Sequence, residues 1–139
     1  MDHSEMIEYV RGQRAGTVST IGPGGAPQAA YLTLAITGRG EFVFDAKPDS
    51  RKVANLRRDG RIAIVVGGAD GTTLQCEGAT DFPAGTGLDR CKAAYLAAFP
   101  EFTESIDGGG VVVLRVVPTW ARFGDFRSGT PELREIRLP

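Results

Sequence analysis

The stretch DSRKVANLRRDGR, residues 49–61, runs directly into the apolar segment IAIVV, residues 62–66. It places a hydroxyl, a guanidinium and an ammonium group, from Ser50, Arg51 and Lys52, at the start of a short predicted helix. A helix N-terminus has unpaired backbone N–H groups and a partial positive charge, so it can hold an anion. Because a β-forming segment follows at once, the sequence predicts an anion site beside a sheet.

The same tripeptide has a simpler interpretation. Ser50 can be a helix N-cap, and Arg51 and Lys52 can be solvated surface cations, which is the commoner meaning of such a tripeptide. Arg57 and Arg58, further along the predicted helix, are expected to be solvated or to form ion pairs. The choice between an anion site and a capped surface helix depends on the rest of the chain.

Composition narrows the classes of function. The chain has 139 residues and a formal net charge of −1, which predicts a single domain over residues 1–139 and gives no sign of a polyanion-binding surface. No apolar run approaches membrane-spanning length. We therefore expect neither nucleic acid nor a membrane as a partner. The N-terminal segment MDHSEMIEYVRGQR has no apolar core typical of a signal peptide, so the expected location is cytoplasmic.

The reactive side chains are few. Cys76 and Cys91 show no metal-ligand spacing, so two free buried thiols and no metal site are expected. His3, the single histidine, lies at an end that we expect to fray, which argues against a catalytic role. No Ser/His/Asp set and no paired carboxylates are visible. The sequence therefore assigns no catalytic residue.

Apolar periodicity and turn residues predict a mainly β chain with flanking helices. Asp70-Gly71 is a strong hairpin signal, and Gly78 predicts a bulge. A small antiparallel barrel would satisfy the sheet edges of such a chain. The predicted strands are Gly16–Ile21, Gln28–Ile36, Glu41–Asp45, 61–68, 72–80 and 111–123, and the predicted helices are Ser4–Arg14, the segment after Ser50, Thr86–Ala98 and a last short helix from Pro131.

The strand predicted over Gln28–Ile36 alternates in character. One face is expected to be mostly core. The other face is small and mildly polar, and suits a flat ring or another subunit; a merely half-exposed face fits the alternation equally well. The first face carries Gln28, Ala30, Leu32, Leu34 and Ile36, and the second carries Ala29, Tyr31, Thr33 and Ala35.

Four segments in this order resemble the FMN-binding split barrel of the pyridoxamine 5'-phosphate oxidase-like superfamily. The resemblance implies an antiparallel split barrel that forms a homodimer, with two FMN sites at the subunit interface. It also implies an oxidoreductase that passes hydride or electrons to a small-molecule substrate. The segments are GTVSTIGPGGAPQAAYLTL, FVFDAKPDSRKVANLRRDGRIAIVV, LQCEGAT and VVVLRVVPTWARF.

The resemblance also implies roles for particular residues. It assigns the FMN phosphate to Ser50, Arg51 and Lys52, and it assigns Gln75 to the flavin ring, although an exposed strand glutamine is the alternative. Further contacts are expected from the strand after Pro27 and from the late aromatic and basic positions; Trp120 can instead be a core or interface aromatic. These contacts are Ala30, Tyr31, Leu32, Thr33, Trp120 and Arg122.

Two departures separate the chain from the true oxidases of the family. The resemblance places Ala30 and Ala35 at the positions where the true oxidases carry an arginine and a lysine. It also predicts an Arg-Leu-His-like element near the C-terminus, and the chain has none there. Oxidation of pyridoxamine phosphate is therefore not expected. Two alternatives to an FMN oxidoreductase stay open: a reductase that uses a deazaflavin, and a flavin- or haem-binding module without turnover.

Overall fold

The computed structural model describes residues 1–139. The elements alternate as the sequence predicts, with most of the strands before the longest helix. The helices are α1 (His3–Gln13), α2 (Arg51–Arg58), α3 (Gly85–Ala98) and α4 (Thr103–Asp107), with short 3-10 turns η1 (Pro23–Gly25) and η2 (Pro100–Phe102). The strands are β1 (Ala15–Ile21), β2 (Pro27–Thr33), β3 (Ala35–Ile36), β4 (Phe42–Ala46), β5 (Arg61–Gly67), β6 (Thr72–Asp81), β7 (Val112–Asp125) and β8 (Glu132–Glu135).

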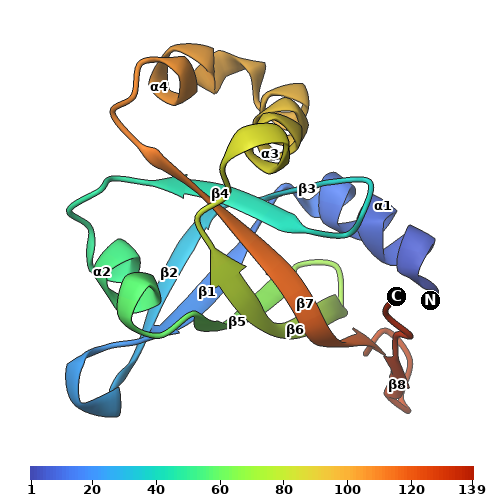
Figure 1. The fold of residues 1–139 in the computed structure, drawn as a ribbon. Coiled ribbons are helices and arrows are strands. Elements are labelled where there is room, and N and C mark those ends of the chain that lie inside the picture. Colours follow the sequence, from blue (N-terminus) through green and yellow to red (C-terminus); the bar gives the residue numbers. More distant parts are fainter.

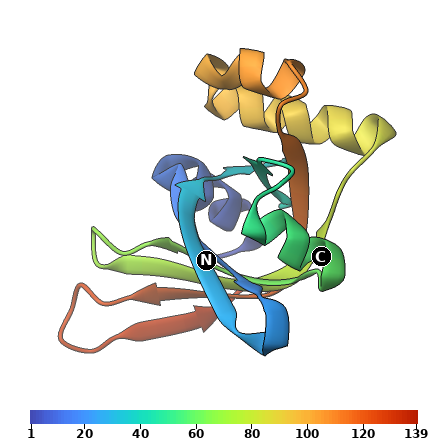
Figure 2. The ribbon, with the colours of Figure 1, turned by 90° about the vertical axis from the view of Figure 1, so that its left-hand side faces the viewer.

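The strands form one eight-stranded sheet in the order β2-β1-β5-β6-β7-β4-β3, with β8 added beside β7. Every pairing is antiparallel. The sheet curls strongly, but its end strands β2 and β3 are not paired with each other, so it remains an open half-barrel (Figures 1 and 2). The predicted mainly β fold, a split barrel with flanking helices, is confirmed.

Two apolar clusters explain why β4 is apolar on both faces. Phe42 and Phe44 point into the main core inside the curl, where α1 and α2 also pack. Val43 points the other way, into a second cluster with Cys91 and Tyr95 of α3. Since successive strand residues face opposite sides, a strand covered on both sides needs a continuous apolar run. Figure 1 shows α3 and α4 on this second side of the sheet.

The predicted bulge at Gly78 is confirmed. The register between β6 and β7 shifts between Glu77 and Gly78, where Pro118 stands opposite Gly78. A Cβ at position 78 would lie 2.7 Å from the Val117 carbonyl oxygen. Only glycine allows this close backbone approach, and the bulge sits where proline interrupts the ladder.

Three predicted boundaries are wrong, each for a local reason. The strand expected over Gln28–Ile36 breaks at Leu34, which separates β2 from β3. The first helix is capped by Asp2 rather than Ser4, because Asp2 and Glu5 form a capping box. Residues 132–135 form strand β8 instead of a helix, because they pair with the end of β7.

The break at Leu34 also changes the predicted face of small residues, Ala29, Tyr31, Thr33 and Ala35. Thr33 bonds through its hydroxyl to the Tyr95 hydroxyl of α3 at 2.7 Å, and Ala35 is buried in the cluster against α3. The chain itself therefore covers half of the face that was expected to meet a partner. Only Ala29 and Tyr31 of that face remain exposed.

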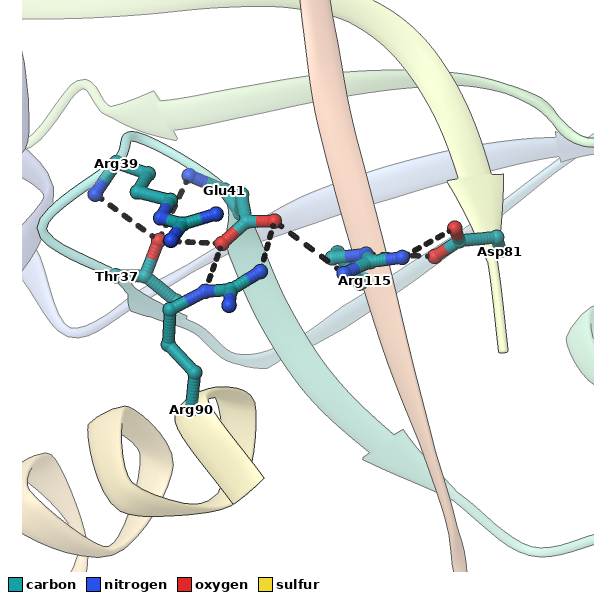
Figure 3. Close-up of polar contacts among 6 residues, drawn as sticks. All are labelled: Thr37, Arg39, Glu41, Asp81, Arg90 and Arg115. Atoms are coloured by element: carbon teal, nitrogen blue, oxygen red, sulfur yellow. Dashed lines mark hydrogen bonds and ion pairs between the residues drawn. The ribbon is translucent and has the colours of Figure 1, made fainter. Parts of the chain in front are cut away.

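An ion network around the buried Glu41 joins α3 to the sheet (Figure 3). Glu41 accepts hydrogen bonds from Thr37 at 2.9 Å and from Arg90 of α3 at 2.9 and 3.1 Å. Arg115 of β7 lies 3.5 Å from Glu41 and continues to Asp81 of β6 at 2.9 and 2.6 Å. The hydrogen bonds from Arg90 are the main reason that the pKa of Glu41 is lowered.

The substitution Glu41→Gln tests this network. The lowered pKa means that ionised Glu41 stabilises the folded state above its ordinary pKa of 4.5, and that this stabilisation is lost as the pH falls through the folded pKa. At pH 7 the variant should lose roughly 1–3 kcal/mol of unfolding free energy, since hydrogen bonds to charged groups contribute about this much. The difference from the parent protein should shrink below about pH 4.5.

Urea unfolding of both proteins from pH 7 to pH 3 measures the effect. Glu8→Gln is the matched control, because Glu8 forms an exposed ion pair with Arg11, and such pairs contribute little. A Glu41→Gln difference that stays constant across this pH range would contradict the role assigned to the Glu41 carboxylate.

Candidate functional site

The helix α2 begins where the sequence predicts. Ser50 has an extended backbone, and its hydroxyl accepts a hydrogen bond from the Val53 N–H at 3.4 Å, which confirms the predicted N-cap. Val53 and Leu56 are buried in the main core and fix the helix against the sheet. The helix N-terminus, with Arg51 and Lys52, is thereby held at one end of the curl (Figures 1 and 2).

A pocket of about 400 Å³ lies between this helix start and the β1–β2 hairpin. The pocket lies along the edge strand β2, from which four consecutive residues, Pro27–Ala30, contribute to its wall. Its lining residues are Val18, Thr20, Pro27, Gln28, Ala29, Ala30, Arg51 and Lys52. The structure thus places two of the predicted phosphate residues, and the capped helix start, at one pocket.

The arginines of α2 have no carboxylate partner. Arg57 stacks on the Phe82 ring, with its guanidinium carbon 4.0 Å from the ring centroid. Arg58 donates to the Ile21 carbonyl at 3.0 Å. Both arginines are exposed, as the first of the two predicted alternatives states, and neither forms an ion pair. The nearby acid Asp59 pairs instead with Arg61, whose hydrogen bonds lower the pKa of Asp59 to about 2. The lining of the pocket itself contains Arg51 and Lys52 and no Asp or Glu.

Three polar residues at the pocket were not assigned to a site from the sequence: Thr20 and Gln28 in its lining and the buried Asn55 bonded to them. Asn55 is 2% exposed and donates to Thr20 and to Gln28, both at 2.9 Å. Gln28 also accepts a hydrogen bond from Arg51 at 3.1 Å. Two signals could have revealed them: Gln28 is the polar residue on an otherwise apolar strand face, and Asn55 lies four residues after Arg51 on one side of the helix.

The residues predicted on β2 do not all lie at this pocket. Ala30 lines it. Leu32 is half-buried against the main core, and Thr33 bonds to Tyr95. Tyr31 points to the opposite side of the sheet and is 78% exposed. Of the four predicted contacts on this strand, the structure brings only Ala30 together with the helix N-terminus.

Gln75 and Trp120 also lie on the opposite side of the sheet. Register places Tyr31, Thr17, Val65, Gln75 and Arg122 in one row across five strands, with Tyr31 and Gln75 about 14 Å apart at three strand spacings. A second row holds Ala29, Ser19, Ala63, Glu77 and Trp120. We call these two rows the outer sheet face.

The outer sheet face has its own polar contacts. The Arg122 guanidinium donates to the Gln75 amide oxygen at 3.5 Å and lies 5.5 Å from the Trp120 ring centroid. Gln75 and the helix N-terminus therefore lie on opposite faces of one sheet. A single chain does not bring all the predicted cofactor contacts together, and these assignments stay predictions.

The remaining reactive groups are sequestered. Cys76 and Cys91 are free and buried, as predicted, and burial raises the pKa of the Cys76 thiol to about 12. His3 lies in α1, half-buried beside Gly40, rather than on a frayed end. The structure contains no group of three or more His, Cys, Asp or Glu side chains that could hold a metal ion. None of its helices has the length and apolar character needed to cross a membrane.

Comparison with known proteins supports the family and the fold. The sequence family described as pyridoxamine 5'-phosphate oxidase matches residues 3–123. The chain belongs to this family. The match covers the edge strand β2, the start of α2 and the outer sheet face, and it confirms the resemblance noted from the sequence. Among curated proteins, none matches the chain.

Solved structures of similar proteins share the fold of this family member. A heme-binding protein from Mycobacterium smegmatis superposes with a TM-score of 0.80 at 21% identity, over 98% of this chain and 61% of that one. A conserved hypothetical protein from Mycobacterium tuberculosis gives 0.77 at 27% identity, over 91% and 86%. The General Stress Protein 26 from Bacillus anthracis gives 0.70 at 15% identity, over 95% and 97%.

Substitutions at Ser50 separate a cap from an anion site. Ser50→Ala should lower the free energy of unfolding by about 1 kcal/mol, because the cap is lost. Ser50→Asp should preserve stability, because Asp caps as well as Ser and favours the helix dipole. Inorganic phosphate should raise the Tm of the parent protein, and it should not raise that of Ser50→Asp, whose carboxylate repels the anion.

Thermal unfolding with and without phosphate provides the measurement, and Ser4→Asp on exposed α1 is the charge-matched control. Equal stabilisation of Ser50→Asp and the parent protein by phosphate would favour the capped surface helix over the anion site.

Proposed function

We propose that this protein is an FMN-binding oxidoreductase of the pyridoxamine 5'-phosphate oxidase family, and that it acts as a homodimer on a small-molecule substrate. One observation carries the proposal. In a chain of this family, the N-terminus of α2 presents Arg51 and Lys52 to a pocket without any carboxylate to neutralise them. Such a site selects a ligand that brings its own negative charge.

The donor set fits a phosphomonoester. Arg51 offers a planar fork of donors, Lys52 offers a compact charge, and the Ser50 hydroxyl lies at the helix N-terminus with the free N–H groups. Bound FMN would supply the hydride and electron chemistry, while the protein orients it and excludes water. The chain's part is therefore to bind the phosphate and to place the ring against substrate.

A homodimer would bring together the predicted cofactor contacts that lie on opposite faces of the sheet in a single chain. The outer sheet face exposes two large side chains in one row, Tyr31 at 78% and Val65 at 45%, which a second copy could cover. Because the pocket lies at edge strand β2 and its lining includes Ala29, a residue of the outer sheet face, a second copy seated on this face would border it. Gln75 and Trp120 of that copy would then reach the ligand held by Arg51 of the first.

Vitamin B6 oxidation is not part of the proposal. Ala30 lines the pocket and supplies no charge there. Ala35 is buried in the apolar cluster against α3, so this position could not serve the pocket even with a longer side chain. A substrate that carries its own phosphate would lack these cationic partners, and a buried phosphate without them is costly.

A second candidate is a haem-binding module without turnover, and the likeness to the heme-binding protein from Mycobacterium smegmatis favours it. The pocket lining contains no His, Cys, Met or Tyr side chain that could ligate iron. Flavin binding is therefore preferred, and a deazaflavin would use the same cations for its phosphate. Absorbance spectra of the purified protein, before and after addition of FMN, distinguish the three cofactors.

Arg51→Ala and Gln75→Ala should affect two ligands differently. Riboflavin lacks the phosphate and should bind far more weakly than FMN. Arg51→Ala should weaken FMN binding about tenfold or more and leave riboflavin nearly unchanged, since one charge-assisted hydrogen bond is worth about this factor. Gln75→Ala should weaken both ligands alike. Titration by flavin fluorescence quenching measures all six affinities, and equal losses of FMN and riboflavin in Arg51→Ala would refute the phosphate site.

Mixed dimers test the shared site. Light scattering at micromolar concentration should give twice the chain mass. A heterodimer that joins an Arg51→Ala chain to a Gln75→Ala chain has one site with both residues intact, so it should bind one FMN per dimer at the parental affinity. Each homodimeric variant should bind weakly at both sites. If Arg51 and Gln75 of the same chain served one ligand, no tight site would return.

A further inference from the structure

The polar residues beneath the pocket form a chain of hydrogen bonds with a fixed direction. Arginine can only donate. Arg58 donates to the Asn55 amide oxygen at 3.1 Å, which turns the Asn55 amide nitrogen toward Thr20 and Gln28. Gln28 must then present its amide oxygen to Asn55. The same oxygen accepts from the Arg51 Nε at 3.1 Å.

This arrangement holds both arginines without neutralising either. We propose that Gln28 and Asn55 are positioning residues: two neutral amides, fixed in direction by Arg58, that orient Arg51 while leaving its positive charge available to an anionic ligand in the pocket. The inference rests on the proposed binding of the FMN phosphate at this pocket. Both arginines are exposed, and each donates to an amide oxygen rather than to a carboxylate. A carboxylate would bind the guanidinium more strongly, but it would also neutralise its charge.

The hydrogen bonds of Gln28 leave several donors at the pocket without an acceptor. Gln28 engages Arg51 only through Nε, so the two terminal amino groups of the guanidinium have no hydrogen-bond partner in the chain. The Gln28 amide nitrogen has no acceptor either and packs on Gly22, where a Cβ would lie 2.5 Å from it. The donors left over are thus those of Arg51 and Gln28, at the wall of the pocket.

The depth of Asn55 explains why it controls the arrangement. Its side chain is 2% exposed, and each of its polar atoms has a hydrogen-bond partner, in Thr20, Gln28 or Arg58. A buried amide with all its hydrogen bonds made is locked in one orientation. Since Asn55 fixes the Gln28 amide, and Gln28 fixes the Arg51 guanidinium, the pocket is preorganised before a ligand arrives.

The substitution Gln28→Glu tests the neutrality of the amide, because it adds a negative charge and keeps the shape of the side chain. The new carboxylate can accept from Asn55 and Arg51 as the amide oxygen does, and the lost N–H groups make no hydrogen bond in the parent protein. The free protein should therefore keep or raise its Tm. The negative charge beside Arg51 should repel the phosphate, and FMN affinity should fall about tenfold or more, while riboflavin affinity is kept.

The deciding quantity is the ratio of the riboflavin Kd to the FMN Kd, measured by fluorescence quenching. Both ligands bind the same folded protein, so any change in stability cancels from this ratio. Gln28→Glu should lower the ratio about tenfold, and Gln13→Glu, with the same change of net charge on α1 away from the pocket, should leave it unchanged.

Two failures can be told apart. If Arg51→Ala lowers the ratio and Gln28→Glu does not, the positioning role is wrong and the phosphate site stands. If the parent protein already binds riboflavin as well as FMN, the phosphate site is wrong and the positioning role falls with it. A merely structural Gln28 would predict a lower Tm with an unchanged ratio, which also overturns the inference.

Discussion

The curl of a single antiparallel sheet around one apolar core is the constraint on which the other features depend. Residues such as Val18, Ile64, Cys76 and Leu114 fill the inside of the curl and are almost fully buried. A half-barrel leaves its ends open, and α2 covers one of them by inserting Val53 and Leu56. The position of the helix N-terminus follows from this packing, because a helix held by its apolar side cannot rotate its first turn away.

The open sheet also creates two different faces with two different tasks. The inside is filled by the core, while α3 and α4 cover the outside only over β3, β4 and β7, where the Glu41 network secures them. The rest of the outside, around Tyr31 and Val65, is left exposed. The pocket lies at the edge strand β2, where the two faces meet, so a second copy placed on the outer face would lie beside it.

The ion pairs of the chain lie away from the pocket. Acidic and basic groups pair where they serve structure, as in Glu41 with Arg90 and Arg115, or Asp59 with Arg61. At the pocket the pairing stops, and neutral amides replace carboxylates as partners of the arginines. Neutral partners are suited to a binding site because they orient a cation without reducing its attraction for an anion.

Local patterns were sufficient for most elements of the fold. The Asp70-Gly71 hairpin, the Gly78 bulge, the Ser50 cap and the two buried cysteines all follow from short-range preferences that tertiary packing did not override. The break at Leu34 and the strand at 132–135 could not be read in this way. Both depend on partners distant in sequence, α3 for the first and β7 for the second.

The candidate site likewise has features set by local sequence and features set by the tertiary structure. The sequence by itself determined that Ser50, Arg51 and Lys52 begin a helix beside a sheet, because capping and helix polarity act within one turn. Only the tertiary structure decided that Gln28 and Asn55 lie beneath these cations, and that Gln75 and Trp120 lie on the other side of the sheet. Strand alternation indicates that residues share a face, but the curl and register of the whole sheet decide which face meets the helix.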